Sequence, residues 1–277
     1  MVHRADPTDA PARVSAIETL DDPRVVEYRL ITIPAQLAQA GLFVAEGRLV
    51  LRRLVDQSRF RIKSILLTPA ARDALGDVLS QVGPGIPVYI ASRAVMSELI
   101  GFTIHRGVLA LVERPRPRQL NELDLAAARR VVILEGVSNP DNVGGVFRSA
   151  AAFGVDAVLL GPGCGDPLYR KAIRTSMAGT LQVAFAVASP WPAVPTALSA
   201  KGFRVLGLTP SADAHSLDDY ERNADRIALV LGAEGQGLSA EALDAIQERV
   251  RIPMRGPADS LNVTVAASIA LWHFSGG

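Results

Sequence analysis

Cysteine is almost absent from this chain of 277 residues, which contains only Cys164. A single cysteine excludes an internal disulfide and fits a reducing compartment, so we expect a cytoplasmic protein. Cys164 is flanked by glycines, and the four histidines are far apart without ligand spacing. These two absences argue against a metal site, because thiolate and imidazole sites need several such ligands together.

Long hydrophobic runs are also missing. No apolar stretch reaches the roughly 18 residues needed to cross a bilayer, so we expect no membrane association. Residues 1–14 contain Pro, Asp and Arg without an apolar core. They do not resemble a secretory signal, and we expect this N-terminus to be disordered. Hydrophobic residues make up 49% of the chain, which is enough for a sizeable core.

Positive charge is unevenly distributed. The first 118 residues carry 16 Lys or Arg and 12 Asp or Glu, although the net charge of the whole chain is only +1. The surplus is concentrated in residues 47–63, which favours an RNA-binding face or, as an alternative, a merely solvated helix surface. The candidate RNA-binding side chains are Arg48, Arg52, Arg53, Arg59, Arg61 and Lys63.

Two domains are predicted. Residues 15–113 read as a small α/β unit with helices over 41–55 and 92–100 and short strands at 64–68, 88–91 and 108–113. Residues 114–128 are rich in Pro and charge and are interpreted as a linker. Residues 129–277 contain five apolar strand-like runs separated by helical stretches, which predicts an α/β domain with a mostly parallel sheet. Those runs are 131–135, 156–160, 183–187, 204–209 and 227–231.

The first candidate site segment is NPDNVGGVFRSAAAFG, residues 139–154. Its apolar residues have helical spacing, and Asp141, Gly144, Gly145 and Arg148 share the opposite face. Two glycines inside a helix cost about 1 kcal/mol each relative to alanine. Close approach of a ligand or another backbone would account for that cost. Helix–sheet packing through the glycines, with a solvated Arg148, is the alternative.

A second segment, LVLGAEGQGLS at residues 229–239, places glycines and Glu234 after a strand. Ligands of open α/β sheets bind beyond the carboxyl ends of the strands. The glycine order differs from the dinucleotide fingerprint, and no Walker lysine follows, which argues against a dinucleotide-dependent oxidoreductase. Taken alone, the segment favours a plain turn before a helix at 239–249.

The third segment, residues 252–273, leads from a short strand through a Gly/Pro loop into an apolar helix. Ser260 is interpreted as the N-cap of this helix. Asn262 would then lie inside the first turn, where asparagine is unfavourable, so a structural role does not explain it. Leu261, Val265, Ile269 and the pair Trp272/His273 are predicted to form the buried stripe.

Together these three segments resemble the SpoU (TrmH-like) family of RNA 2′-O-ribose methyltransferases, within the SPOUT superfamily. Ser149 and Gly145 stand where that family often has Thr and Ala. The resemblance covers about residues 130–275, and residues 15–113 are similar, more weakly, to a ribosomal-protein-like RNA-binding domain. The matching residues are Asn139, Pro140, Asn142, Gly144, Arg148, Gly154, Gly232, Glu234, Gly235, Gly237, Ile252, Pro253, Met254, Ser260, Leu261 and Asn262.

The resemblance implies a deep trefoil knot that binds S-adenosylmethionine, and a homodimer in which each active site borrows from its partner. It implies cofactor contacts at Leu208, Thr209, Gly232, Ala233, Glu234, Gly235, Ile252, Met254 and Leu261. It implies a catalytic set of Arg148, Asn142, Glu234, Ser260 and Asn262.

The implied reaction moves a methyl group to a ribose 2′-hydroxyl of RNA, with rRNA favoured over tRNA because of the RNA-binding domain. We expect Arg148 to stabilise the developing alkoxide or to hold a phosphate, because a guanidinium normally stays protonated. The other four residues are expected to orient Arg148, the ribose and the loops. A non-catalytic RNA-binding factor in ribosome assembly is the alternative, but such a factor has no chemical need for all five residues.

Overall fold

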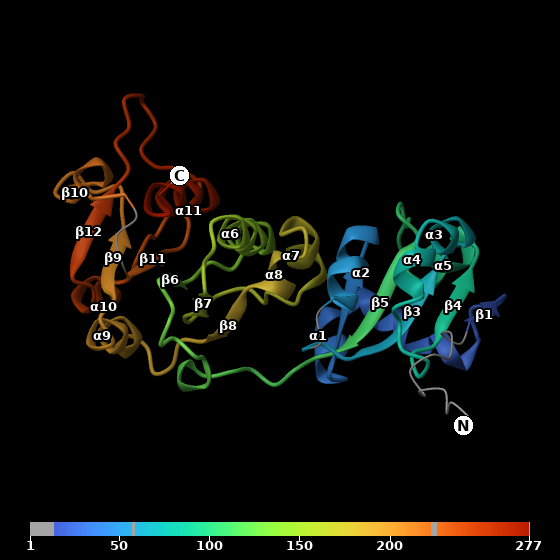
Figure 1. The fold of residues 1–277 in the computed structure, drawn as a ribbon. Helices are drawn as coiled ribbons and strands as arrows, with labels where there is room; N and C mark the ends of the chain where they lie inside the picture. Colours follow the sequence, from blue (N-terminus) through green and yellow to red (C-terminus); the bar gives the residue numbers. More distant parts are fainter. Residues whose placement is uncertain (1–13, 57–58, 223–225, 277) are drawn as a thin grey trace, which may run out of the picture. The chain divides into compact units, whose positions relative to one another are not determined.

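The computed structural model describes residues 14–56, 59–222 and 226–276, which divide into two compact units (Figure 1). The first unit contains the described residues up to Pro115 together with Leu168–Arg174. The second contains Arg116–Pro167 and the described residues from Thr175 onward. The predicted disordered N-terminus lies outside the described residues, except for Val14, with which the first strand begins.

A mixed five-stranded sheet, in the order β1-β4-β3-β5-β2, forms the first unit. Strands β1, β4 and β3 run parallel, whereas β5 pairs antiparallel with β3 and β2. The strands predicted at 64–68, 88–91 and 108–113 are present. The bounds are β1 (Val14–Ile17), β2 (Leu42–Glu46), β3 (Ile62–Leu67), β4 (Val88–Ala91) and β5 (Val108–Glu113).

Residues 41–55 do not form the single helix that we predicted. Residues Leu42–Glu46 form β2, whose five side chains are all buried, and α2 (Arg48–Val55) begins only after Gly47. Gly47 has a φ of 109°, a backbone conformation that favours glycine and here separates strand from helix. An apolar run that is buried on both faces fits helical spacing as well as strand spacing, so periodicity could not distinguish them.

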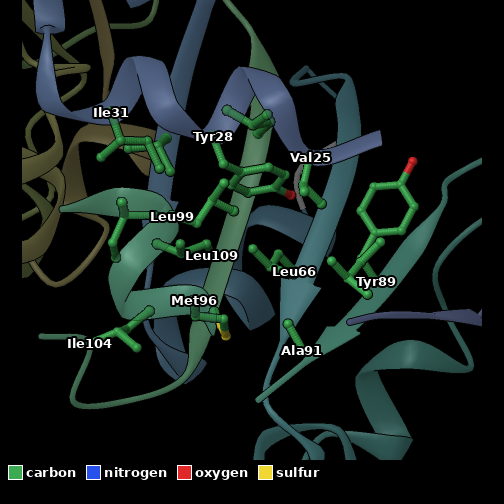
Figure 2. Close-up of a cluster of buried hydrophobic side chains, with 14 of the residues drawn as sticks. Val25, Tyr28, Ile31, Leu66, Tyr89, Ala91, Met96, Leu99, Ile104 and Leu109 are labelled. Atoms are coloured by element: carbon green, nitrogen blue, oxygen red, sulfur yellow. The ribbon is translucent and has the colours of Figure 1, made fainter. Parts of the chain in front are cut away.

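A core cluster that includes Tyr28 joins this sheet to the helices formed by residues 23–32, 34–39 and 93–100 (Figure 2). The Tyr28 hydroxyl lies 3.0 Å from Ser64 Oγ, which satisfies its polar atom inside the core. The predicted helix at 92–100 is present as α5, with Ser92 as its N-cap. The helices are η2 (Pro23–Thr32), α1 (Pro34–Gln39), α3 (Pro69–Asp73), α4 (Gly76–Leu79) and α5 (Arg93–Ile100).

The second unit contains a seven-stranded sheet in the order β10-β12-β9-β11-β6-β7-β8, and every pairing in it is parallel. The five predicted strands are present, and the prediction of a parallel α/β domain is confirmed. The bounds are β6 (Arg130–Leu134), β7 (Ala157–Leu160), β8 (Ala184–Val187), β9 (Arg204–Leu208), β10 (His215–Ser216), β11 (Ile227–Leu231) and β12 (Glu248–Arg251).

Helices α6 and α11 pack side by side in this unit (Figure 1). Helix α9 contributes buried side chains to a hydrophobic core that also contains residues of the sheet. The predicted helix at 239–249 ends early, because α10 stops at Ala245 and β12 follows. The elements are η3 (Leu120–Glu122), α6 (Pro140–Ala152), α8 (Gly179–Gln182), α9 (Ala193–Ala200), η4 (Leu217–Asp219), α10 (Ala240–Ala245) and α11 (Val263–Phe274). Helix α7 (Arg170–Thr175) belongs, as far as Arg174, to the first unit.

Most of the segment interpreted as a linker is part of the second unit. Leu125 and Ala128 are buried in its core, and the backbone N–H of Val187 in β8 donates to Arg118 O at 2.8 Å. The proline and charged residues of this segment indicated solvent exposure correctly, but its few apolar residues pack into the core of the second unit.

Strand order places four strand ends next to one another. The chain passes from β6 to β7 and β8, and then returns to the other side of β6 with β9, β11 and β12. Since all these strands are parallel, the segments following β12, β9, β11 and β6 share one edge of the sheet. A reversal of strand order at such an edge is where open α/β sheets bind ligands. Among the described residues, no helix has the length and apolar character needed to span a membrane.

Candidate active site

A cavity of about 820 Å³ lies at this edge of the second sheet. Its walls come from the residues that follow β9, β11 and β12 and from the start of α11. The volume is within the range of small-molecule sites in proteins. All nine residues predicted to contact the cofactor line it: Leu208, Thr209, Gly232, Ala233, Glu234, Gly235, Ile252, Met254 and Leu261.

The loop after β11 owes its shape to glycine. Ala233 and Gly237 exchange backbone hydrogen bonds of 3.1 and 2.9 Å, which folds the loop into a tight hairpin. A Cβ on Gly232 would lie 2.2 Å from the carbonyl carbon of Gly237, so that position must lack a side chain. The hairpin then presents Glu234 at the cavity. Both interpretations of this segment therefore hold: it is a turn before α10, and it also lines the cavity.

Asn262, and not Ser260, is the N-cap of α11. Its Oδ1 accepts a hydrogen bond from Thr264 N at 2.9 Å, and the helix begins at Val263. The predicted cap at Ser260 was therefore wrong, and the helix explains Asn262 after all. Ser260 is exposed and lines the cavity, two residues before the cap.

The Asn262 side chain joins the three sequence segments. Its Nδ2 donates to Asn142 Oδ1 at 3.0 Å and to Glu234 Oε1 at 2.5 Å. A primary amide has only two N–H groups, so both donors of Asn262 are used while its oxygen caps α11. Asn142 is 8% exposed and belongs to α6, whereas Glu234 belongs to the loop after β11. One amide thus fixes α6, the β11 loop and α11 together.

Arg148 is exposed on α6 and does not line the cavity. Among the described residues its guanidinium has no hydrogen-bond or ion-pair partner. The structure therefore brings Asn142, Glu234 and Asn262 into contact, places Ser260 beside them, and leaves Arg148 apart. Our expectation that the other four residues orient Arg148 is not met within one chain.

Glycine in α6 serves helix packing. A Cβ on Gly145 would lie 2.5 Å from Cγ2 and 2.6 Å from Oγ1 of Thr264 on α11. Ser149, one turn further along, lies 2.7 Å from Ser268 Oγ in the same helix pair. The close approach at Gly145 is therefore made by a side chain of a neighbouring helix, whereas our packing alternative had placed the sheet there.

The basic residues of the first unit are partly neutralised. Arg52 pairs with Asp77, Arg61 with Glu113 at 3.2 Å, and Lys63 with Glu27 at 2.6 Å. Such exposed pairs lower the local positive potential. The Arg59 guanidinium stacks over the Phe60 ring at 4.8 Å, whereas Arg48 is exposed and Arg53 half-buried.

Sequence reasoning missed two charged residues of the cavity wall, Arg249 and Asp259. Arg249 lies 3.8 Å from Asp213 and is the cation among the lining residues. Its position in a strand ending at the same sheet edge was a usable signal, but Arg249 had been included in the predicted helix at 239–249 and not in the short strand predicted after it. Within the described part of the chain, no group of three His, Cys, Asp or Glu could hold a metal ion.

Comparison with known proteins identifies the family. The profile of the SpoU rRNA methylase family matches residues 129–272, which is more than half of the chain. This chain belongs to the SpoU rRNA methylase family. It is 43% identical over 260 residues to an uncharacterized tRNA/rRNA methyltransferase of Mycobacterium bovis, covering 91% of this chain and 88% of that protein.

A more distant relative has a defined reaction. The 23S rRNA (guanosine(2553)-2'-O)-methyltransferase RlmP of Bacillus subtilis is 27% identical over 262 residues, covering 94% of this chain and 99% of RlmP. The fold also matches the crystal structure of an AdoMet-bound rRNA methyltransferase from Sinorhizobium meliloti. That match has a TM-score of 0.79 at 24% identity and covers 94% and 97% of the two chains. The two chains therefore share the same α/β fold over almost their whole length.

Proposed function

We propose that this member of the SpoU family transfers a methyl group from S-adenosylmethionine to a ribose 2′-hydroxyl of ribosomal RNA. The observation that carries the proposal is the double hydrogen bond of Asn262, which joins Asn142 and Glu234 at the edge of a ligand-sized cavity. A plain structural cap would need only the Asn262 oxygen. The relative RlmP, named for rRNA ribose methylation, supports the choice of substrate class.

The cavity residues suit this cofactor. Leu208, Ile252 and Leu261 provide apolar surface for an adenine ring, and the backbone around Gly232 provides hydrogen-bonding groups. The carboxylates of Glu234 and Asp259 provide negative charge, which favours a positively charged sulfonium. When bound, the cofactor supplies an electrophilic methyl group.

Arg148 has the chemistry to assist the hydroxyl. An alcohol is a weak nucleophile, so the site must stabilise negative charge that develops on the 2′-oxygen. A guanidinium stays protonated in proteins and presents a planar set of N–H donors. Arg148 is exposed and has no partner among the described residues, so its donors are available to an alkoxide or a neighbouring phosphate.

Arg148 is on α6 rather than on the cavity wall of its own chain, which favours an active site shared between two copies. Helix α11 exposes the apolar residues Val265, Ile269 and Trp272, which were predicted to be buried. Val265 and Trp272 are each 46% exposed. We propose that this face forms a homodimer, in which the Arg148 of one protomer serves the cavity of the other. A partner would cover the apolar surface that water otherwise contacts.

The first unit is proposed to bind structured RNA. Within the basic segment, Arg48 and Arg53 have no ion-pair partner among the described residues. Phosphate contacts of this kind bind RNA without reading its sequence. This unit favours a large structured target, and so rRNA over tRNA.

The decisive experiment measures methyl transfer from labelled S-adenosylmethionine to total rRNA and, separately, to total tRNA. Both RNA pools come from cells that lack this protein, and incorporation is mapped to ribose or base. Wild type is compared with Arg148→Ala and with Lys201→Ala. Lys201 follows α9, at the opposite edge of the sheet from the cavity, and serves as the control.

We expect ribose methylation of rRNA by wild type and Lys201→Ala, and loss of it in Arg148→Ala. Incorporation into tRNA alone would replace the proposed substrate but keep the reaction. The assembly-factor alternative would be supported if the protein bound the cofactor but methylated neither pool. The rRNA of immature subunits would then also have to remain unmethylated. Incorporation that persists in Arg148→Ala would contradict the role of Arg148.

A further inference from the structure

Glu135 is a buried carboxylate that takes no direct part in the cavity wall. It follows β6 and is 8% exposed. Its carboxylate accepts hydrogen bonds from Trp191 Nε1 at 2.9 Å, from Ser239 N at 2.9 Å and from Ser239 Oγ at 2.7 Å. Burying a charge is costly unless the charge is well hydrogen-bonded, and these three donors offset that cost.

Two of the hydrogen-bond partners of Glu135, Leu231 and Ser239, lie at the two ends of one loop. The backbone N–H of Glu135 donates to Leu231 O at 2.9 Å, and Leu231 is the last residue of β11. Ser239, which binds the carboxylate, is the N-cap of α10. The residues between them, 232–238, all line the cavity and include Glu234. A single residue behind the cavity therefore fixes both the start and the end of its glycine loop.

Trp191 holds the same carboxylate from the other side. Its indole packs where a Cβ on Gly161 would lie, 3.4 Å away, and its N–H donates to the oxygen that Ser239 Oγ also contacts. Trp191 does not line the cavity, and neither does Glu135. The indole therefore holds the carboxylate from outside the cavity wall.

We propose that Glu135 is a positioning residue for the cofactor, acting through Ser239 on the loop of residues 232–238. The inference rests on the proposed binding of S-adenosylmethionine in this cavity. A glycine-rich loop has many accessible conformations, and fixing its ends removes much of that freedom before the cofactor binds. Loss of the Glu135–Ser239 contacts then lowers cofactor affinity more than it lowers the rate at saturating cofactor.

Glu135→Gln gives a sharp test because glutamine cannot satisfy all three donors. If its oxygen faces Ser239 Oγ and Trp191, its NH₂ group meets the N–H of Ser239. If its oxygen faces Ser239 N, its NH₂ group meets the indole N–H of Trp191. Either orientation places two donors against each other. Trp191→Phe removes the indole donor, so the second orientation becomes acceptable in Glu135→Gln/Trp191→Phe.

The experiment measures the dissociation constants of S-adenosylmethionine and S-adenosylhomocysteine by calorimetry, together with Tm. The proteins are the wild-type full chain, Glu135→Gln, Ser239→Ala, Trp191→Phe and Glu135→Gln/Trp191→Phe. We expect Glu135→Gln to weaken binding of both ligands about tenfold, as loss of a charged hydrogen bond does. Trp191→Phe should stay within about twofold of wild type, because its contact lies outside the loop.

Ser239→Ala should weaken binding by roughly fivefold, because it removes one of the two loop contacts. Glu135→Gln/Trp191→Phe should recover most of the affinity that Glu135→Gln loses. A purely structural role would lower Tm in all four variants and leave the dissociation constants unchanged, which would overturn the proposal. So would equal affinities of Glu135→Gln and the double variant. Failure of wild type itself to bind either ligand would instead refute the proposed function.

Discussion

Asn262 Nδ2 lies 3.0 Å from Asn142 Oδ1, although the two residues are separated by 120 positions in the chain. The same nitrogen contacts Glu234, and the Asn262 oxygen caps α11. The oxygen of Asn262 therefore stabilises the start of α11, and its nitrogen holds Asn142 and Glu234 together. The two roles can be separated by substitution.

Asn262→Asp should keep the helix cap and lose the assembly of the site. Aspartate can still accept from Thr264 N, but it has no N–H donor and would place a carboxylate beside Glu234. We expect methyl transfer to fall about 100-fold through misplacement of the site, with little change in stability. Asn262→Ala should lose both functions and also about 1 kcal/mol of stability. Tm and kcat/KM of both variants distinguish these effects, and similar turnover by Asn262→Asp and wild type would contradict them.

Gly145→Ala should destabilise the second unit by roughly 1–3 kcal/mol, because the added methyl group meets Thr264 at 2.5 Å. Thr264→Ala in the same chain should restore part of that loss, since it removes the two side-chain atoms nearest to the new methyl. Gly76→Ala is the matched control, because a Cβ there meets nothing within 4 Å. Chemical denaturation measures all three, and equal stability of Gly145→Ala and Gly76→Ala would refute the packing explanation.

The pH–rate profile of Arg148→Lys distinguishes two roles of this residue. If Arg148 stabilises negative charge, a lysine can replace part of its charge but not its planar set of donors. We then expect residual activity of about 1% or less, with the same pH dependence as wild type. A lysine variant that recovers turnover with a shifted pH profile would establish a general base and contradict our assignment.

Trp272→Glu should convert a dimer into a monomer and abolish methyl transfer, because it introduces a charge into the proposed interface on α11. Val26→Glu is the control, since Val26 is 48% exposed but belongs to the first unit. Light scattering measures the mass of each protein. The shared site can also be tested by mixing two inactive variants, Arg148→Ala and Asn262→Asp, both with Trp272 unchanged. Some activity should return, because a mixed dimer combines an intact cavity with an intact Arg148. A monomeric wild-type protein with full activity would exclude the shared site.

Glu248 should make stability depend on acid pH. Its pKa is lowered from 4.5, first by the hydrogen bond from Arg204, whose Nε lies 2.6 Å from Oε1. Because the folded pKa is lowered, the stabilisation is complete above about pH 4.5 and is lost as the pH falls through the folded pKa. Glu248→Gln should cost about 1 kcal/mol at neutral pH, since Arg204 is half exposed. The stability difference from wild type should shrink as the pH falls below about 4.5 and through the folded pKa, and a difference that stays constant as the solution is acidified would contradict the assignment.

The same cluster should respond at alkaline pH. Tyr220 donates to Glu248 Oε2 at 2.7 Å, and burial, followed by this contact, raises the pKa of Tyr220 to about 12. Its neutral form is therefore favoured in the folded chain, and that contribution is lost as the pH rises through this value. Glu248 of β12 thus contacts Arg204 of the neighbouring strand β9 and Tyr220 at the same time.

The parallel strands of the second unit were predictable because runs such as residues 131–135 and 227–231 are uniformly apolar, which indicates burial on both faces. The same uniformity misled us at residues 41–55 and in α11. In α11 nearly every face is apolar, so periodicity cannot choose the buried one. Tertiary contacts bury Ala267 and Leu271 and leave Ile269 exposed.

The sequence by itself determined the family, the sheet-edge position of the glycine loops and nine of the residues that line the cavity, because each is carried by local motifs. The tertiary structure alone decided which of those residues touch. Asn142, Glu234 and Asn262 meet because four parallel strands end at one edge, and Arg148 stays apart because α6 carries it away from that edge. The role of Glu135 could likewise be inferred only from the tertiary structure, because its partners Trp191 and Ser239 are more than 50 residues away in the chain.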